Sequence, residues 1–303
     1  KMVSALIRSL GNIAVPENAT VDVLIVENDT APKTESVIRA LTPLANGLTL
    51  DYVHEPDLGI PLARNRAARE ALDRGAMLLA FIDDDEEVAP DWLVELVRRY
   101  RESDAVLIGG PVGLTPAPEN LPALERAMHA DITGHFAKLE ARAEEDARTG
   151  TVAIATNNWL GETTLFSEHD IWFDVGLRFT GGSDSRFYRD VRAKGLPLTW
   201  APKALVLATM PRERLCFGYQ FRNMRDRTRT RFHMILTDRR FTRLRLLVSA
   251  PFKLLAAGLL TLALPFRGGR GILDVARNLG WVAGRASAAF GLRSTLYHRI
   301  EGE

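Results

Sequence analysis

Residues 77–93 read MLLAFIDDDEEVAPDWL, an apolar run that ends abruptly in five acidic residues. The apolar half, residues 77–82, predicts a buried strand, and the apolar residues that follow the acids at helical spacing predict a helix. Side chains alternate along a strand, so the pattern predicts that Asp83 and Asp85 converge while Asp84 faces away. Two converging carboxylates suit a hard divalent cation that keeps its other positions for water and phosphate oxygens. The alternative is a solvated acidic loop.

Alternating strand and helix patterns fill the first third of the chain. Strands are predicted at 21–26, 49–53, 77–82 and 105–109, and helices at 2–10, 33–41, 61–73 and 90–101. Because the strands are almost continuously apolar, they predict an α/β fold with a mostly parallel sheet covered by helices on both faces. Ligands of such sheets gather beyond the carboxyl ends of the strands, where residues 27–30 and 83–85 both lie. This coincidence favours a ligand site at that edge.

The middle of the chain is less regular. Its segments are predicted as a proline-rich loop at 111–122, a long polar helix at 124–148, and strand-like pieces at 152–155 and 163–166. Two glycines then lead to Asp184 at the start of a helix that is predicted to end near residue 194. An aspartate near a helix N-terminus is stabilised as the anion. Asp184 is therefore either a simple helix cap or a functional carboxylate.

The composition is that of an ordinary globular protein, but the charge is distributed unevenly along the chain. Of 303 residues, 25% are charged and 46% are apolar, which excludes global disorder. The net charge is only +1, but residues 201–303 hold 19 Lys and Arg against 6 Asp and Glu. An acidic N-terminal part, residues 1–200, and a basic, apolar C-terminal part, residues 201–303, predict two surfaces with different partners. Because Cys216 is the only cysteine, no intrachain disulfide forms, which is typical of a reducing compartment.

Residues 212–245 contain eleven arginines interleaved with aromatic residues. Such interleaving can bind nucleic acid, but no nucleic-acid-binding motif accompanies it, so we expect no nucleic-acid partner. The segment could instead bind a donor diphosphate or an anionic lipid carrier, with Arg222 and Arg225 as the candidate residues. A merely solvated helix face is the third interpretation.

Residues 246–266 are almost wholly apolar. The longest stretch without a charge, residues 254–266, has 13 residues, whereas a spanning helix needs about 20, and Lys253 further disfavours spanning. Flanking arginines suit a segment that lies in the headgroup region of an anionic membrane, and residues 272–292 could join it. We therefore expect peripheral attachment to the cytoplasmic face of the plasma membrane. A buried core hairpin is the alternative.

Four short motifs occur in the order and spacing of family 2 glycosyltransferases. They are Glu27-Asn-Asp-Thr30 after a strand, Gly59-Ile-Pro-Leu-Ala-Arg-Asn65 opening a helix, Asp83-Asp-Asp85, and Gly181-Gly-Ser-Asp184. The resemblance covers roughly residues 2–235. Within this family, the segments FIDDDEE and TGGSD make the chain most similar to bacterial exopolysaccharide glucosyltransferases of the succinoglycan type.

The resemblance implies a GT-A fold, in which a nucleotide-binding α/β unit is fused to an acceptor-binding half. We expect a catalytic domain at 1–210 and, from the charge and apolar patterns described above, a basic, helical, membrane-associated extension at 211–303. It also implies metal-dependent, inverting transfer of a sugar from a nucleotide-sugar donor such as a UDP-hexose to a lipid-linked saccharide. The implied site residues are Glu27 and Asn28 on the base or ribose, Arg64 and Asn65 on the nucleotide, Asp83 and Asp85 on Mg²⁺ or Mn²⁺, and Asp184 as the general base. Family members begin with a strand before the helix predicted here at 2–10. We therefore expect a further upstream segment, and a sheet that is built differently is the alternative.

Two other functions fit parts of the pattern. A sugar-phosphate nucleotidyltransferase also uses an acidic metal site beside an α/β sheet, but its glycine- and lysine-bearing phosphate loop is not seen in this sequence. A catalytically silent membrane adaptor that keeps the fold is the second alternative. The released product distinguishes the three functions. A glycosyltransferase releases a nucleoside diphosphate, a nucleotidyltransferase releases pyrophosphate, and a silent adaptor releases neither.

Overall fold

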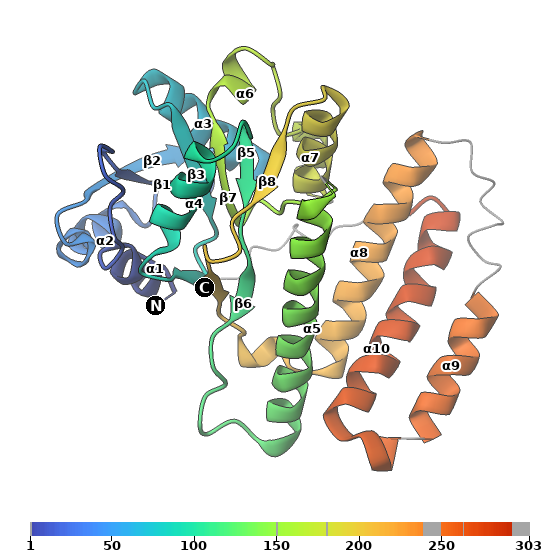
Figure 1. Ribbon diagram of the computed structural model, residues 1–303. Coiled ribbons are helices and arrows are strands. Elements are labelled where there is room, and N and C mark those ends of the chain that lie inside the picture. Colours follow the sequence, from blue (N-terminus) through green and yellow to red (C-terminus); the bar gives the residue numbers. More distant parts are fainter. Residues whose placement is uncertain (1, 150, 180, 239–249, 263, 293–303) are drawn as a thin grey trace. The chain divides into compact units, whose positions relative to one another are not determined.

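The computed structural model describes residues 2–149, 151–179, 181–238, 250–262 and 264–292 (Figure 1). The chain divides into two compact units. The first unit comprises Lys1–Thr115, His135–Arg178 and Ser183–Thr209, and the second comprises Pro116–Gly134, Phe179–Gly182 and Met210–Glu303.

The first unit is built from short strands and helices that alternate along the chain. Its N-terminal elements are α1 (Met2–Leu10), β1 (Asp22–Asn28), α2 (Glu35–Ala40), β2 (Thr49–Glu55), α3 (Ile60–Asp73), β3 (Leu78–Ile82), β4 (Glu86–Val88), α4 (Trp92–Arg101), β5 (Leu107–Gly109) and β6 (Val112–Leu114). After α5 (Ala123–Arg148), which belongs partly to each unit, come β7 (Asn158–Glu162), α6 (Thr164–Ser167), α7 (Ser183–Ala193), β8 (Leu198–Trp200) and β9 (Val206–Ala208).

The strands form three sheets. β1 and β2 pair in parallel, with Asp22 opposite Thr49 and Asn28 opposite Glu55. The second sheet has the order β3-β7-β5-β8 and the third has the order β4-β9-β6. The predicted α/β class with flanking helices is confirmed. The second and third sheets are mixed, whereas a mostly parallel sheet was predicted, because β7 enters between β3 and β5 and runs antiparallel to both, while β4 runs antiparallel to β9.

The predictions for individual segments succeed where the hydrophobic pattern extends over many residues. Every element predicted between residues 2 and 109 is present, with its ends within two residues of the prediction, and the helix at 124–148 is confirmed as α5. The strand predicted at 163–166 is wrong, because these residues lie almost wholly in α6, and residues 152–155 form no strand. The loop predicted at 111–122 contains β6. Three-residue strands such as β6, β8 and β9 are too short to show alternation.

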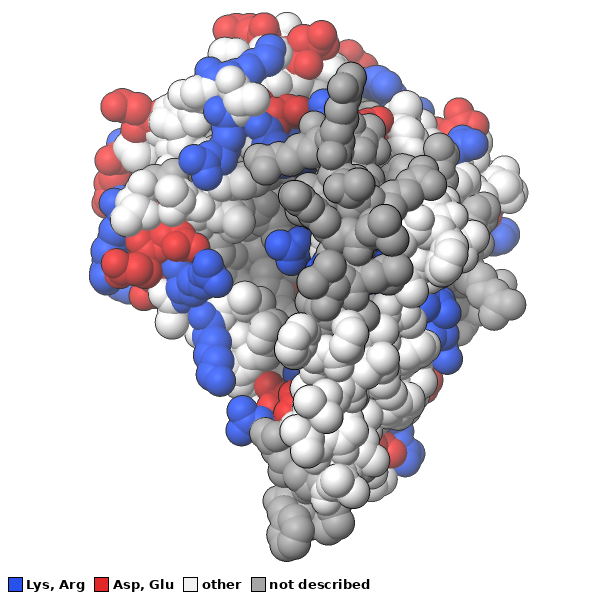
Figure 2. Space-filling model, turned by 90° about the vertical axis from the view of Figure 1, so that its right-hand side faces the viewer, with Lys and Arg blue, Asp and Glu red and all other residues white. Residues whose placement is uncertain are grey.

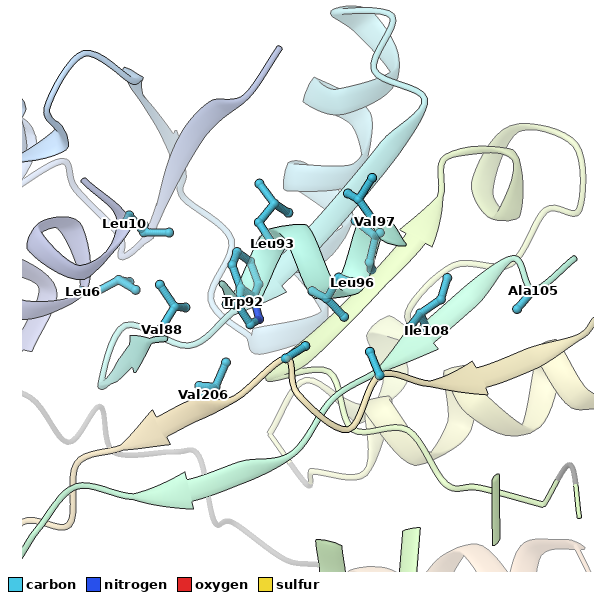
Figure 3. Close-up of a cluster of buried hydrophobic side chains, with 13 residues drawn as sticks. Leu6, Leu10, Val88, Trp92, Leu93, Leu96, Val97, Ala105, Ile108 and Val206 are labelled. Atoms are coloured by element: carbon cyan, nitrogen blue, oxygen red, sulfur yellow. The ribbon is translucent and has the colours of Figure 1, made fainter. Parts of the chain in front are cut away.

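An apolar cluster joins α1 and α4 to the strands (Figure 3). The buried stripe of α4 runs from Trp92 to Val97 at the helical spacing of the sequence, and it belongs to the same cluster as Leu6, Leu10 and Val206. Burial of such large side chains supplies the main driving force for this packing. The cluster therefore holds α4, the helix that follows the acidic segment, against α1 and the strands.

Asn158 is a buried polar hub at the start of β7, and only 1% of its surface is exposed. Its Nδ2 donates to the carbonyl oxygens of Pro111 at 2.8 Å and of Ala204 at 2.7 Å. Its Oδ1 accepts a hydrogen bond of 2.9 Å from Nε1 of Trp92. One amide thus ties α4 to the β5–β6 and β8–β9 connections, with all three of these buried groups satisfied.

The second unit is helical, as the sequence predicts for its C-terminal part. Its main elements are α8 (Phe217–Asp238), α9 (Ala250–Leu262) and α10 (Leu264–Ala289). α8 and α10 approach closely at two glycines: a Cβ at Gly280 would lie 2.5 Å from the carbonyl oxygen of Phe221, and one at Gly284 would lie 2.4 Å from that of Arg225. Small residues at this spacing let two helix backbones come together.

Ion pairs join α10 to the first turns of α5 within the same unit. Asp131 lies 3.2 Å from the guanidinium nitrogens of both Arg270 and Arg277. Among the helices that the structure describes, none combines the length and the apolar character needed to cross a bilayer. The predicted arginine-rich and apolar segments fall partly on residues 239–249 and 263, which lie outside the described residues.

Replacing Asn158 by alanine tests the hub. Asn158→Ala leaves the buried carbonyl oxygen of Ala204 and the indole N–H of Trp92 without partners, while the carbonyl oxygen of Pro111 keeps its hydrogen bond from the N–H of Val206. We expect the free energy of unfolding to fall by about 3 kcal/mol or more. The exposed Asn12, whose Nδ2 donates to the carbonyl oxygen of Arg8, provides the control, and Asn12→Ala should cost less than about 1 kcal/mol. Urea denaturation measures both values. Equal losses in the two variants would contradict the role of the hub.

Candidate active site

The acidic segment forms a tight turn between two strands. β3 ends at Ile82 and β4 begins at Glu86, whose N–H donates to the carbonyl oxygen of Asp83 at 3.3 Å. The carbonyl oxygen of Asp85 accepts from the N–H of Thr209 at 2.9 Å, which fastens the turn to the end of β9. The strand alternation predicted for this segment is therefore wrong. The convergence of Asp83 and Asp85 comes from the turn.

Three carboxylates meet in this turn. One oxygen each from Asp83, Asp85 and Glu86 lie within 4.8 Å of one another, and Asp84 is not part of the group, as the sequence predicts. Hard carboxylate oxygens at this separation match the ligands that Mg²⁺ and Mn²⁺ prefer. The sequence reasoning missed Glu86 as a member. Its only signal is its place in the acidic run, because nothing in the sequence shows that its side chain turns inward.

Asp83 sits among opposing charges. Its side chain is 49% exposed, and its Oδ1 lies 3.6 Å from Nη2 of Arg64. Desolvation by the surrounding protein raises the pKa of Asp83, the Arg64 guanidinium lowers it, and the negative charges of Asp85 and Asp184 raise it further, with a net upward shift. The charge of Asp184 therefore acts on Asp83 although the two residues are about one hundred positions apart in the sequence.

Glu86 is the buried member of the group, with 2% of its surface exposed. Its Oε2 accepts from the N–H of Asp83 at 3.0 Å, and its Oε1 accepts from Nδ2 of Asn157 at 2.7 Å. Desolvation, together with the negative charges of Asp83 and Asp85, raises the pKa of Glu86 to about 8, against the smaller lowering by these hydrogen bonds. Glu86 thus holds the turn in shape by linking it to the residue before β7.

Arg64 and Asn65 are neighbours in the N-terminal half of α3, but their side chains make different contacts. The Arg64 guanidinium lies 5.6 Å from the centre of the Phe173 ring and faces Asp83. Asn65 is buried, and its amide closes two hydrogen bonds with the backbone of Phe173, at 2.9 Å and 3.0 Å. The structure therefore brings Arg64 to the acidic turn. It places both polar atoms of Asn65 in a clasp within the protein, and nucleotide contact by Asn65 stays a prediction.

Asp184 lies in the first turn of α7, next to the preceding glycine pair. Gly181 and Gly182 have φ angles of 77° and 88°, a conformation that side chains with a Cβ rarely adopt. Oδ1 of Asp184 accepts from the N–H of Ser185 at 2.7 Å. Three residues along, Phe187 stacks on Phe173 with ring centres 4.4 Å apart. This aromatic contact holds α7 in place, and Asp184 as general base stays a prediction.

Glu27 uses its carboxylate to organise the loop after β1. Oε1 accepts from the N–H of Lys33 at 3.0 Å, and Oε2 accepts from both the N–H and the hydroxyl of Thr34 and from the Tyr52 hydroxyl. Although desolvation opposes them, these hydrogen bonds lower the pKa of Glu27. They give Glu27 a structural role, and contact with a base or ribose stays a prediction.

Asn28 links the end of β1 to the start of α3. Its Oδ1 accepts from the N–H of Gly59 at 2.7 Å, and its Nδ2 donates to the carbonyl oxygen of Glu55 at 3.0 Å. Gly59 has φ 140°, and a Cβ there would lie 2.5 Å from Cβ of Arg178, so the glycine of this motif permits a close approach. Asn28 thus fixes the loop that leads to Arg64.

Arg222 and Arg225 lie on α8 in the second unit. The Arg225 guanidinium pairs with the neighbouring Asp226 at 2.9 Å, which raises the pKa of Arg225. Their predicted role in donor or lipid binding stays a prediction. Of the predicted site residues, the structure brings Asp83, Asp85 and Arg64 together at the acidic turn, and the charge of Asp184 acts on Asp83.

Known proteins resemble the chain in sequence and in fold. The model of Glycosyl transferase family 2 matches residues 1–158. The Succinoglycan biosynthesis protein ExoM of Rhizobium meliloti (strain 1021) is 31% identical over 214 residues, which are 70% of this chain and 64% of that protein. The chain thus spans somewhat less than two thirds of that relative. The crystal structure of S. aureus TarS 1-349 aligns with a TM-score of 0.50 at 13% identity, covering 100% of this chain and 91% of that one, and shows likeness of fold.

The raised pKa of Glu86 predicts a specific dependence of stability on pH. In the folded protein its pKa is about 8, above the ordinary value of 4.5, so the folded state binds the proton more tightly than the unfolded state. The free energy of unfolding should therefore fall as the pH rises from about 4.5 to about 8, by an amount on the order of 4 kcal/mol at about 1.4 kcal/mol per pKa unit.

Glu86→Gln should remove this dependence, because glutamine keeps the shape of the protonated acid and Asn157 can turn its amide to pair with it. Urea denaturation in EDTA at several pH values between 5 and 8.5 compares the variant with the wild-type protein. Glu87→Gln, also on β4, is the matched control for loss of one carboxylate. Parallel stability curves for wild type and Glu86→Gln would contradict the prediction.

Proposed function

The chain belongs to Glycosyl transferase family 2, and we propose that it transfers a sugar from a nucleotide-sugar donor, a UDP-hexose, to a lipid-linked saccharide acceptor. The name of its 31% identical relative supports a place in exopolysaccharide or cell-surface glycan synthesis. The observation that carries the proposal is the convergence of Asp83, Asp85 and Glu86 beside Arg64, within electrostatic reach of Asp184.

The donor set fits Mg²⁺ or Mn²⁺. Ligand oxygens on opposite sides of a small divalent cation lie about 4 Å apart, which is compatible with three carboxylate oxygens within 4.8 Å of one another. We assign Asp83 and Asp85 as the residues that would hold the ion, with Glu86 keeping the turn in shape. When bound, such an ion neutralises negative charge on a departing diphosphate.

The remaining groups supply orientation and proton transfer. Arg64 offers a second positive charge for the diphosphate next to Asp83. Asp184 takes the proton of the acceptor hydroxyl as the acceptor oxygen bonds to the anomeric carbon and the bond from that carbon to the diphosphate breaks. A single displacement of this kind inverts the anomeric configuration.

The other assignments complete the proposal. Glu27 and Asn28 lie at the end of β1, where they would meet the base or ribose, and Asn65 supports the nucleotide side of the site by fixing Phe173. Residues 1–210 form the catalytic domain and residues 211–303 the extension. Arg222 and Arg225 of α8 contribute positive charge to donor or lipid binding. The protein works at the cytoplasmic face of the plasma membrane, where a lipid-linked acceptor is found.

Substitution in the acidic turn tests catalysis. With Mn²⁺ and UDP-glucose or another UDP-hexose that the wild type accepts, Asp85→Asn and Asp184→Asn should each lower the rate of UDP release at least a hundredfold, because one weakens the metal site and the other removes the base. Asp84→Asn is the matched control, and its rate should stay within about threefold of wild type. Release of pyrophosphate instead of UDP, or rates independent of Asp85 and Asp184, would contradict the proposal.

The stereochemistry of the product tests the role of Asp184 separately. A single displacement from an α-linked donor should give a β-linked product, which the coupling constant of the anomeric proton in NMR reports. An α-linked product would show retention and would overturn the assignment of Asp184 as the base of a one-step reaction.

A further inference from the structure

The outward face of α9 is apolar where a helix of a water-soluble protein is normally polar. Phe252, Leu255, Leu259 and Leu262 follow one another at spacings of three and four residues, so they share one face of the helix. Together with Leu254 they are between 49% and 77% exposed. The buried side of α9 is smaller, because Ala257 is its only fully buried residue among those described.

A row of this kind differs from the scattered apolar residues found on every protein surface. Five large apolar side chains are exposed within 13 residues, and contiguous exposure of this extent marks an interaction surface. Figure 2 shows the side of the molecule on which α9 lies, and much of its described surface carries no charged side chain.

The length of α9 limits how it can meet a membrane. Thirteen residues at about 1.5 Å each give a helix of about 20 Å, which is shorter than the hydrocarbon core of about 30 Å. No described helix meets the requirements for a membrane span. A short helix with a one-sided apolar face suits an orientation parallel to the bilayer surface.

Basic residues outnumber acidic residues in the segment that contains α9 and α10. Residues 250–292 hold five basic residues and one acidic residue, and two of the five, Arg270 and Arg277, pair with Asp131 of α5. Lys253 lies on α9 among the exposed apolar residues, and its ammonium group is 5.7 Å from the ring centre of Trp281 on α10. A lysine and a tryptophan beside an apolar face are the residue types that anchor protein segments at headgroup level.

We propose that the face of α9 formed by Phe252, Leu255, Leu259 and Leu262 docks on an anionic bilayer surface, with its side chains in the boundary between headgroups and acyl chains. The proposed lipid-linked acceptor would be met at that surface, so the inference deepens the proposed function. Its test needs no sugar donor, so failure of membrane docking and failure of the transferase proposal are distinguishable.

Co-sedimentation with vesicles tests the docking face. The full chain should pellet with vesicles of phosphatidylglycerol and phosphatidylcholine at low salt, and much less with vesicles of phosphatidylcholine alone. The double variant Leu255→Ser/Leu259→Ser should lower the vesicle partition coefficient at least roughly tenfold. Leu139→Ser, which removes an exposed leucine of α5, is the matched control and should bind as wild type does.

Two further measurements keep the outcome clear. Circular dichroism must show an unchanged melting temperature for the double variant, and UDP release with water as acceptor should also be unchanged, since α9 carries no residue of the candidate active site. Sedimentation velocity without lipid tests a second copy of the chain as the occupant. A dimer that the double variant dissociates, or equal vesicle binding by the double variant and wild type, would overturn the proposal.

Discussion

Mutual repulsion of carboxylates is the constraint on which the candidate site depends. Oxygens of Asp83, Asp85 and Glu86 are held within 4.8 Å of one another, and Asp184 adds negative potential at Asp83. In the protein alone, Arg64 offsets part of this charge and the raised pKa of Glu86 offsets another part. This arrangement is costly by itself and would become favourable with a divalent cation at its centre. In the proposed reaction, such an ion would neutralise the negative charge on the departing diphosphate.

The fold of the first unit maintains this arrangement through buried polar and aromatic contacts. The Asn158 hub fixes the start of β7 against α4, and the neighbouring Asn157 anchors Glu86. Phe173 connects three parts of the site: the Asn65 clasp binds its backbone, Arg64 lies over its ring, and Phe187 of α7 stacks on it. Phe173 therefore contacts both α3, which carries Arg64, and α7, which carries Asp184.

The sequence predicted the elements with long hydrophobic periods and the residue types of the site, but not the geometry that joins them. Asp83 and Asp85 were identifiable from an apolar run that ends in acids, whereas the turn that makes them converge depends on pairing of β4 with β9, two strands of three residues each. Burial of Glu86 and the double clasp of Asn65 rest on tertiary contacts with Asn157 and Phe173. No local pattern reports such contacts, and for the same reason β7 was missed.

Binding of Mn²⁺ in the presence of UDP tests the central claim most directly. Titration followed by the electron paramagnetic resonance signal of free Mn²⁺ should show one ion bound per chain with UDP, and Asp83→Asn or Asp85→Asn should weaken this binding by tenfold or more while Asp84→Asn leaves it unchanged. Mn²⁺ binding that is equal in all four proteins, or undetectable in the wild type with UDP, would contradict the account.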